Sequence, residues 1–172
     1  MTTQDPRNDG NHQVGNVTER IIGVLSDTHG LIREGVLKKL ACCELIIHAG
    51  DIGNVTVLEQ LRSIGKVVAV RGNVDRGPWS ANLKEAESVD LYGKTILVIH
   101  NIDDLKRYPP WPNLDVVIYG HSHRASTNYK HGTLYMNPGS AGPRRFGLPT
   151  SIAYLRLIGQ HVTAEIIPIE ER

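Results

Sequence analysis

The first half of the chain alternates short apolar runs with segments of helical periodicity. Apolar runs occupy residues 20–26, 44–50 and 66–72, and apolar residues at helical spacing occupy the intervening segments, 31–41 and 54–65. Short runs rich in valine and isoleucine are typical of strands, and each connection is long enough for a helix. The order strand–helix–strand–helix–strand predicts a parallel sheet with helices packed against it.

The second half of the chain contains mainly hairpin patterns. Apolar runs flank turn signals at residues 93–94, 131–132 and 159–160, and residues 114–120 have the pattern of another buried strand. Strands joined by such short turns pair antiparallel, so this half is expected to be mostly antiparallel. The two halves together predict one α/β domain, a sandwich with mixed sheets.

The N-terminal segment has a different composition from the rest. Residues 1–18 are polar and lack the basic start and hydrophobic segment of a signal peptide, so we expect a mobile tail before a domain at 19–172. The chain has 19 Lys and Arg against 18 Asp and Glu, which gives no reason to expect specific nucleic-acid binding. No apolar run approaches the roughly 20 residues of a membrane span. A cytoplasmic location is therefore expected.

Polar side chains follow five different apolar runs, each at the point where the run ends. Ligands of open α/β sheets bind in the crevice beyond the carboxyl ends of the strands. These side chains are therefore expected to converge on one crevice. The set comprises Asp27, His29, Asp51, Asn73, His100, His121 and His123.

Each of these residues also has a simpler explanation when taken alone. Asp27 or Asp51 would cap a helix, Asn73 would belong to a turn, and His100 would be an ordinary histidine at a strand end. All of these explanations would have to hold together, in order along the chain. Glycines precede several of the polar residues and permit tight turns and close backbone approach, which favours the shared crevice.

The donor atoms of this set indicate a type of metal centre. Imidazoles, carboxylates and an amide oxygen suit borderline divalent ions such as Mn, Fe, Co or Zn, and the set lacks the thiolates of a cysteine-type zinc site. Seven ligands are too many for one ion. Two ions about 3.5–4 Å apart, sharing one carboxylate, fit the set better.

The ordered motifs resemble those of a known family. D-x-H at 27–29, G-D at 50–51, G-N-x-D at 72–75, a strand-end histidine at 100 and G-H-x-H at 120–123 are similar to the calcineurin-like metallophosphoesterases. The chain most resembles the small YfcE-type phosphodiesterases, which are related to the retromer scaffold subunit, and it shares NPGS at residues 137–140 with that subgroup. The resemblance covers about residues 20–168. It implies the metallophosphoesterase fold, a single-domain α/β/β/α sandwich of two mixed β-sheets flanked by helices.

The resemblance also implies a ligand set and a reaction. One ion would be held by Asp27, His29, Asp51 and His123. The other would be held by Asp51, Asn73, His100 and His121. Asp51 would bridge the ions together with a hydroxide that attacks phosphorus in line, so Asp51, His100 and Asn73 are the expected catalytic residues. Manganese is the expected metal, with iron, cobalt, nickel or zinc as alternatives.

The chain departs from the family pattern at two points. Val74 stands where family members have a histidine that can protonate a leaving group, which favours diesters and good leaving groups over alkyl monoesters. Many relatives have H-G-H where this chain has His100, Asn101, Ile102 and Asp103, so the second histidine is missing. The chain between residues 103 and 112 is short, which predicts an open crevice and a broad substrate range.

Five further side-chain positions have weaker predictions. Asp75 is expected to orient a ligand or to pair with a neighbouring arginine, and His48 is expected to pack or to support a ligand. Trp79 is a candidate wall of the crevice. The pair at residues 144–145, both arginine, could contact a phosphate or lie solvated on the surface.

A protein-binding scaffold is the main alternative to an enzyme. Scaffold relatives lose the histidine of D-x-H, whereas His29 is present here, as are the other ligand positions. An amidohydrolase-type use of the H-x-H at 121–123 is disfavoured because such enzymes carry this motif on an early strand. The expected substrate is a small phosphodiester or nucleotide-type ester, and hairpin edges are compatible with a homodimer.

Overall fold

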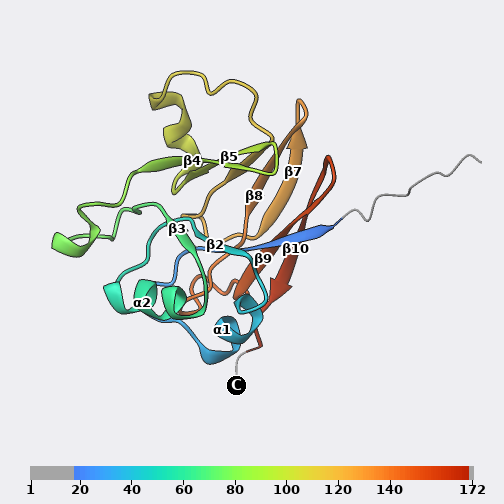
Figure 1. Ribbon diagram of the computed structural model, residues 1–172. Helices are drawn as coiled ribbons and strands as arrows, with labels where there is room; N and C mark the ends of the chain where they lie inside the picture. Colours follow the sequence, from blue (N-terminus) through green and yellow to red (C-terminus); the bar gives the residue numbers. More distant parts are fainter. Residues whose placement is uncertain (1–17, 171–172) are drawn as a thin grey trace, which may run out of the picture.

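The computed structural model describes residues 18–170, so almost all of the predicted tail lies outside the described residues. The first half of the chain forms the predicted alternation (Figure 1): β1 (Glu19–Leu25), α1 (Glu34–Leu40), β2 (Leu45–His48), α2 (Val55–Ile64) and β3 (Val67–Ala69). The predicted ends of α2 are confirmed, because the Asn54 side chain accepts a hydrogen bond from the Thr56 amide at 3.0 Å and Gly65 is the C-cap.

The second half contains all three predicted hairpins and two 3₁₀ helices. Its elements are η1 (Pro78–Ser80), β4 (Ala86–Leu91), β5 (Lys94–Ile99), η2 (Ile102–Arg107), β6 (Val116–Ile118), β7 (Ser126–Lys130), β8 (Thr133–Asn137), β9 (Ser151–Ile158) and β10 (His161–Pro168). The expectation that this half is mostly antiparallel is only partly correct. Strands β5, β6 and β8 pair in parallel, because longer connections return the chain to the same edge each time.

The strands form two mixed five-stranded sheets. The first has the order β10-β9-β1-β2-β3 and the second the order β4-β5-β6-β8-β7. The last hairpin therefore leaves the second sheet and extends the first, where β9 pairs antiparallel to β1. The family fold expected from the sequence is confirmed in its two mixed sheets and its layered order.

Three apolar clusters hold the layers together. The largest lies between the sheets and includes Val24, Ile47, Val98 and Ile118, all fully buried. A second cluster joins the first sheet to α1 and α2, which lie on its opposite side (Figure 1). The third covers the outer face of the second sheet with η2 and the following loop. The outer layer on that side is thus a 3₁₀ helix and a loop in place of α-helices.

None of the helices between residues 18 and 170 is long and apolar enough to cross a membrane.

The intersheet core makes a direct prediction about stability. Replacing Ile118, which is fully buried, with alanine is expected to lower the free energy of unfolding by about 2–5 kcal/mol, because the fixed sheets on both sides cannot close the cavity. The matched substitution Ile158→Ala removes the same atoms from a side chain that is 38% exposed and is expected to cost less than about 1 kcal/mol. Urea unfolding of both variants tests this. Equal losses would contradict the layered core.

Candidate metal centre

The carboxyl ends of strands from both sheets meet at one edge of the molecule. Asp27 and His29 follow β1, and Asp51 follows β2 in the first sheet. His100 follows β5, and His121 and His123 follow β6 in the second sheet. The two sheets therefore deliver side chains to this edge from both sides of the intersheet core. Six of the seven predicted side chains belong to two compact groups there.

The first group consists of Asp27, His29 and His123. The Nε2 atoms of His29 and His123 are 3.1 Å apart, and Asp27 Oδ1 lies 3.3 Å from His123 Nε2 and 4.0 Å from His29 Nε2. Asp27 is completely buried and His123 is nearly so. Three atoms that each can donate an electron pair thus surround one small space.

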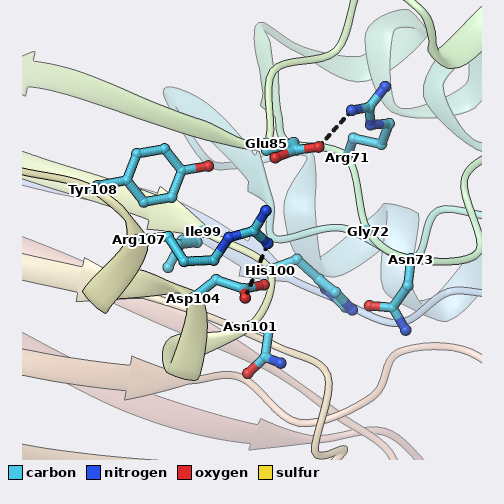
Figure 2. Close-up of a pocket in the computed structure, with 10 residues that line it drawn as sticks. All are labelled: Arg71, Gly72, Asn73, Glu85, Ile99, His100, Asn101, Asp104, Arg107 and Tyr108. Atoms are coloured by element: carbon cyan, nitrogen blue, oxygen red, sulfur yellow. Dashed lines mark hydrogen bonds and ion pairs between the residues drawn. The ribbon is translucent and has the colours of Figure 1, made fainter.

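The second group consists of Asp51, His100 and His121. Asp51 Oδ1 lies 3.3 Å from His100 Nε2, and the rings of His100 and His121 meet edge to face with centroids 5.3 Å apart. The ligand atoms of the group all lie within 4.8 Å of one another. Asn73, the seventh predicted residue, follows β3, and its amide lies beside the His100 ring (Figure 2).

The backbone of the two groups is strained. Asp27, His29, Asp51, His121 and His123 all have positive φ angles, between 47° and 67°. Residues other than glycine rarely adopt this left-handed conformation, and strain of this kind persists where the surrounding structure imposes it for a function. The turns aim these side chains inward immediately after each strand. The conformation of five site residues therefore supports a functional edge.

Glycines allow the loops that carry the two groups, which we call the ligand loops, to approach one another closely. A Cβ atom on Gly72 would lie 2.1 Å from the Asp51 backbone nitrogen, and one on Gly120 would lie 1.9 Å from Ser26 Oγ. Both positions are therefore closed to any larger residue without movement of a ligand loop. The glycines noted in the sequence thus serve close approach at these two positions.

Asp75 supports the loops through their backbones. Its carboxylate accepts hydrogen bonds from the amides of Gly53 at 2.7 Å and Gly72 at 2.8 Å. Pairing of Asp75 with Arg71, one of the predicted alternatives, is wrong, since Arg71 pairs with Glu85. Asp75 instead fixes the two loops that carry Asp51 and Asn73.

Sequence reasoning assigned no role to the NPGS segment, yet it anchors the site. Asn137 Nδ2 donates to the Gly120 carbonyl at 2.8 Å, and Ser140 Oγ donates to the Asp27 carbonyl at 3.0 Å. Both side chains are buried. They tie the end of β8 to the loops that carry the first group. Because their partners are backbone atoms of distant residues, only the motif itself could have indicated them.

His48 is a buried support rather than a ligand. Its Nδ1 accepts a hydrogen bond from the Gly50 amide at 3.2 Å, so its Nε2 carries the proton and donates to Thr28 Oγ1 at 2.8 Å. Thr28 Oγ1 donates in turn to the Ile52 carbonyl at 3.0 Å. This chain links the loops after β1 and β2. The predicted supporting role is confirmed by these contacts.

Trp79 does not wall the crevice as expected. The chain turns at Gly77, with φ 101°, into the 3₁₀ helix η1, and the Trp79 side chain packs against the cluster between the first sheet and its helices. Another aromatic residue lies at the site instead. Phe146 is 81% exposed and meets the His123 ring edge to face, with centroids 5.6 Å apart. Sequence reasoning missed it, because a single exposed phenylalanine gives no pattern.

Burial and neighbouring charges perturb the acids and bases of the site. Burial raises the pKa of Asp27 to about 6, so a cation nearby would favour its ionised form. Burial also acts to raise the pKa of Asp51, but His100, whose Nε2 lies 3.3 Å away, and the amide of Val74 bring it down to about 2. Burial, followed by the charge of Arg145, lowers the pKa of His29. Burial likewise lowers the pKa of His123. Burial also acts to lower the pKa of His100, but the nearby Asp51 carboxylate outweighs it and raises that pKa. The first group therefore favours neutral imidazoles with lone pairs available for a metal.

The unpaired atoms of the two groups fit metal ions. His100 Nδ1 donates to the Ala49 carbonyl at 2.7 Å, so Nε2 is the ring nitrogen that faces the Asp51 carboxylate. His100 Nε2 and Asp27 Oδ1 are buried and have no hydrogen-bond partner. Buried unpaired polar atoms are costly, and lone pairs that face one another repel. A divalent cation in each group would remove both penalties.

The family of the chain follows from its sequence similarity. Residues 21–159 match the family model of the calcineurin-like phosphoesterase superfamily domain. A probable metallophosphoesterase of Methanocaldococcus jannaschii is 35% identical over 167 residues, covering 88% of this chain and 82% of the relative. A phosphodiesterase of the same organism is 26% identical, with 75% and 89% covered. The chain belongs to the calcineurin-like phosphoesterase superfamily.

Solved structures share the fold. The phosphoesterase Yfce of E. coli superposes with a TM-score of 0.65 at 22% identity, covering 87% of this chain and 100% of that one. Vacuolar protein sorting 29 of Cryptosporidium parvum superposes with a TM-score of 0.70 at 18% identity, covering 89% and 99%. The resemblance to small YfcE-type proteins is thereby confirmed. The same architecture also occurs in the vacuolar sorting protein.

The Gly72 contact predicts a paired effect on stability and metal binding. Gly72→Ala would force its Cβ into the Asp51 backbone and is expected to cost about 1–3 kcal/mol of unfolding free energy and to weaken divalent metal binding. Gly35→Ala is the matched control, since nothing lies within 4 Å of that position in α1, and it is expected to stabilise by up to about 1 kcal/mol. Urea unfolding and calorimetric metal titration measure both. An unchanged metal affinity in Gly72→Ala would contradict the role of this contact.

His48 predicts a pH dependence of stability in metal-free protein. Burial lowers the pKa of His48 to about 3, whereas histidine in an unfolded chain has a pKa of about 6.5. Between these values only the unfolded chain binds the proton, so stability falls as the pH drops from about 6.5 toward 3. The variant His48→Leu is expected to be less stable at pH 7 but to lose less stability on acidification. Urea unfolding at pH 7 and pH 4 tests this, and parallel pH profiles would refute it.

Proposed function

We propose that this protein is a dinuclear metal-dependent phosphodiesterase. The observation that carries the proposal is the pair of groups at the sheet edge, each with a buried carboxylate and two imidazoles whose ligand atoms face one another. One ion would be held by Asp27, His29, Asp51 and His123. The second would be held by Asp51, Asn73, His100 and His121. The Asp51 carboxylate lies close enough for its charge to act on the pKa of His29 and His123 in the first group as well as on that of His100 in the second. This position between the groups supports its bridging role.

Each catalytic residue would act through the atom it presents at the edge. Two divalent ions held there would lower the pKa of water and so would supply hydroxide near neutral pH for the hydrolysis of a phosphate ester. His100 is oriented for ligation by the hydrogen bond from its Nδ1 to Ala49, and Asp51 is oriented by the amide of Val74, which donates at 3.0 Å. Asn73 would supply its amide oxygen. Manganese as the metal and a cytoplasmic location remain predictions.

Preference for diesters follows from position 74. Val74 is 43% exposed next to Asn73, and its side chain has no proton to give to a departing alkoxide. Esters with good leaving groups need no such proton. The relative of M. jannaschii that is named a phosphodiesterase supports the same preference.

A protein-binding scaffold is the second candidate function. The likeness to vacuolar protein sorting 29 favours it, because the same two-sheet architecture occurs there. Against it, His29 is present and lies 3.1 Å from His123 in the first group. Burying the carboxylates and imidazoles of the two groups is costly, and a protein that binds no metal would gain nothing in return. We therefore place the enzyme first.

The test compares hydrolysis of bis(p-nitrophenyl) phosphate and p-nitrophenyl phosphate by chelator-treated protein supplied with Mn, Co, Ni, Zn or Mg. We expect metal-dependent turnover that prefers the diester. Asp51→Asn is expected to lower kcat/KM by at least about 100-fold, because it removes the bridging carboxylate.

The matched control is Asp90→Asn, which makes the same change at an exposed position on β4 and is expected to leave turnover unchanged. If protein shown by calorimetry to bind two metal ions hydrolysed neither ester, the scaffold would be the better reading.

A further inference from the structure

A cavity of about 200 Å³ opens beside His100, at the second group of the metal centre. His100 and Asn73 form one side of it, and Asn101, Arg107 and Tyr108 form another (Figure 2). Its volume is smaller than the roughly 300–1,000 Å³ of typical drug-sized sites, so it accommodates a single small group. A phosphate ester held at the second group would therefore have one substituent next to this cavity.

The start of η2 forms one wall of this cavity. Asn101 caps η2, and its side-chain oxygen accepts a hydrogen bond from the Asp103 amide at 3.0 Å. The helix that begins there carries Asp104 and Arg107 to the cavity. The segment after residue 103 thus contributes side chains to a partly open cavity beside the site, and the broad substrate range expected from its short length remains a prediction.

The charges of the cavity are balanced in pairs. Arg71 Nη2 lies 2.7 Å from Glu85 Oε1, and Arg107 Nη1 lies 3.3 Å from Asp104 Oδ1. Figure 2 shows both pairs facing the cavity. Two guanidinium groups and two carboxylates give no net charge. They offer hydrogen-bond donors and acceptors side by side.

We propose that this cavity binds one ester substituent of the substrate, and that the substituent is a small polyhydroxyl group such as ribosyl or glyceryl. The proposal rests on the proposed phosphodiesterase function. Each hydroxyl both donates and accepts, so it can bond a carboxylate and a guanidinium together. An apolar substituent would desolvate the ion pairs without compensation. An additional anionic group would have to displace Glu85 or Asp104 from its arginine.

Calorimetric titration of manganese-loaded protein with three phosphomonoesters tests the proposal without turnover. Ribose 5-phosphate, glycerol 3-phosphate and methyl phosphate share the phosphate and differ in the group that would enter the cavity. We expect at least one hydroxylated ester to bind about tenfold or more tightly than methyl phosphate, since hydrogen bonds to charged groups are strong. Preference for the ribose ester would indicate nucleotide-type substrates, and preference for the glycerol ester would indicate glycerophosphodiesters.

The variant Arg107→Ala separates the cavity from the metal centre. Arg107 is 66% exposed, so its removal should leave the fold intact, and we expect the preference to disappear while methyl phosphate binds as before. Lys106→Ala is the matched control on the same 3₁₀ helix, where the side chain lines a different groove. It is expected to keep the preference.

Three results would overturn the proposal. They are equal affinity of the wild type for all three esters, no measurable binding of any of them, and an equal loss for all three in Arg107→Ala. The hydrolysis assay distinguishes failure of the binding proposal from failure of the proposed phosphodiesterase function. If the protein prefers the hydroxylated esters but hydrolyses no diester, the binding proposal holds and the phosphodiesterase function is wrong. If it hydrolyses diesters without this preference, the phosphodiesterase function holds and the binding proposal is wrong.

Discussion

The structure of the site depends on an electrostatic constraint at the edge where the two sheets meet. Lone pairs of Asp27, His29 and His123 converge there, as do those of Asp51, His100 and His121. Such groups repel one another in a buried setting unless a cation lies between them. The left-handed turns and the close glycine contacts all serve to hold this otherwise unfavourable arrangement in place. These features lower the stability of the fold, and such a cost is expected to persist only where it serves a function, here the binding of cations.

Much of this arrangement could be predicted from local sequence patterns. Strands and hairpins are specified by apolar runs and turn residues near one another in the chain, and all three predicted hairpins form. Side chains at strand ends could be assigned to one edge because parallel strands share their carboxyl ends. Six of these side chains lie in two compact groups, and Asn73 lies beside His100. The assignment of each residue to one of two ions remains a prediction.

Features that depend on distant partners could not be predicted in the same way. The pairing of β9 with β1, more than 120 residues apart, and the parallel pairing of β5, β6 and β8 leave no local trace in the sequence. Asp75, Asn137 and Ser140 form hydrogen bonds with backbone atoms of remote loops, so the identity of these partners requires the fold. The same holds for Trp79, which follows a tight turn at Gly77 and packs, partly buried, against the cluster between the first sheet and its helices.

The proposed role of η2 would let one fold keep a candidate metal centre and still vary the ester group that it binds. The two groups are fixed by backbone hydrogen bonds and by contacts that exclude any Cβ atom, so these loops tolerate little change. The segment that carries Asp104 and Arg107 instead lies between β5 and β6, where side chains line the cavity without supporting a ligand loop. Changes in this segment can alter the recognised group at low cost in stability. Differences in function among proteins of this fold are therefore expected to lie in such segments, while the sheet edge itself determines whether metal chemistry is available at all.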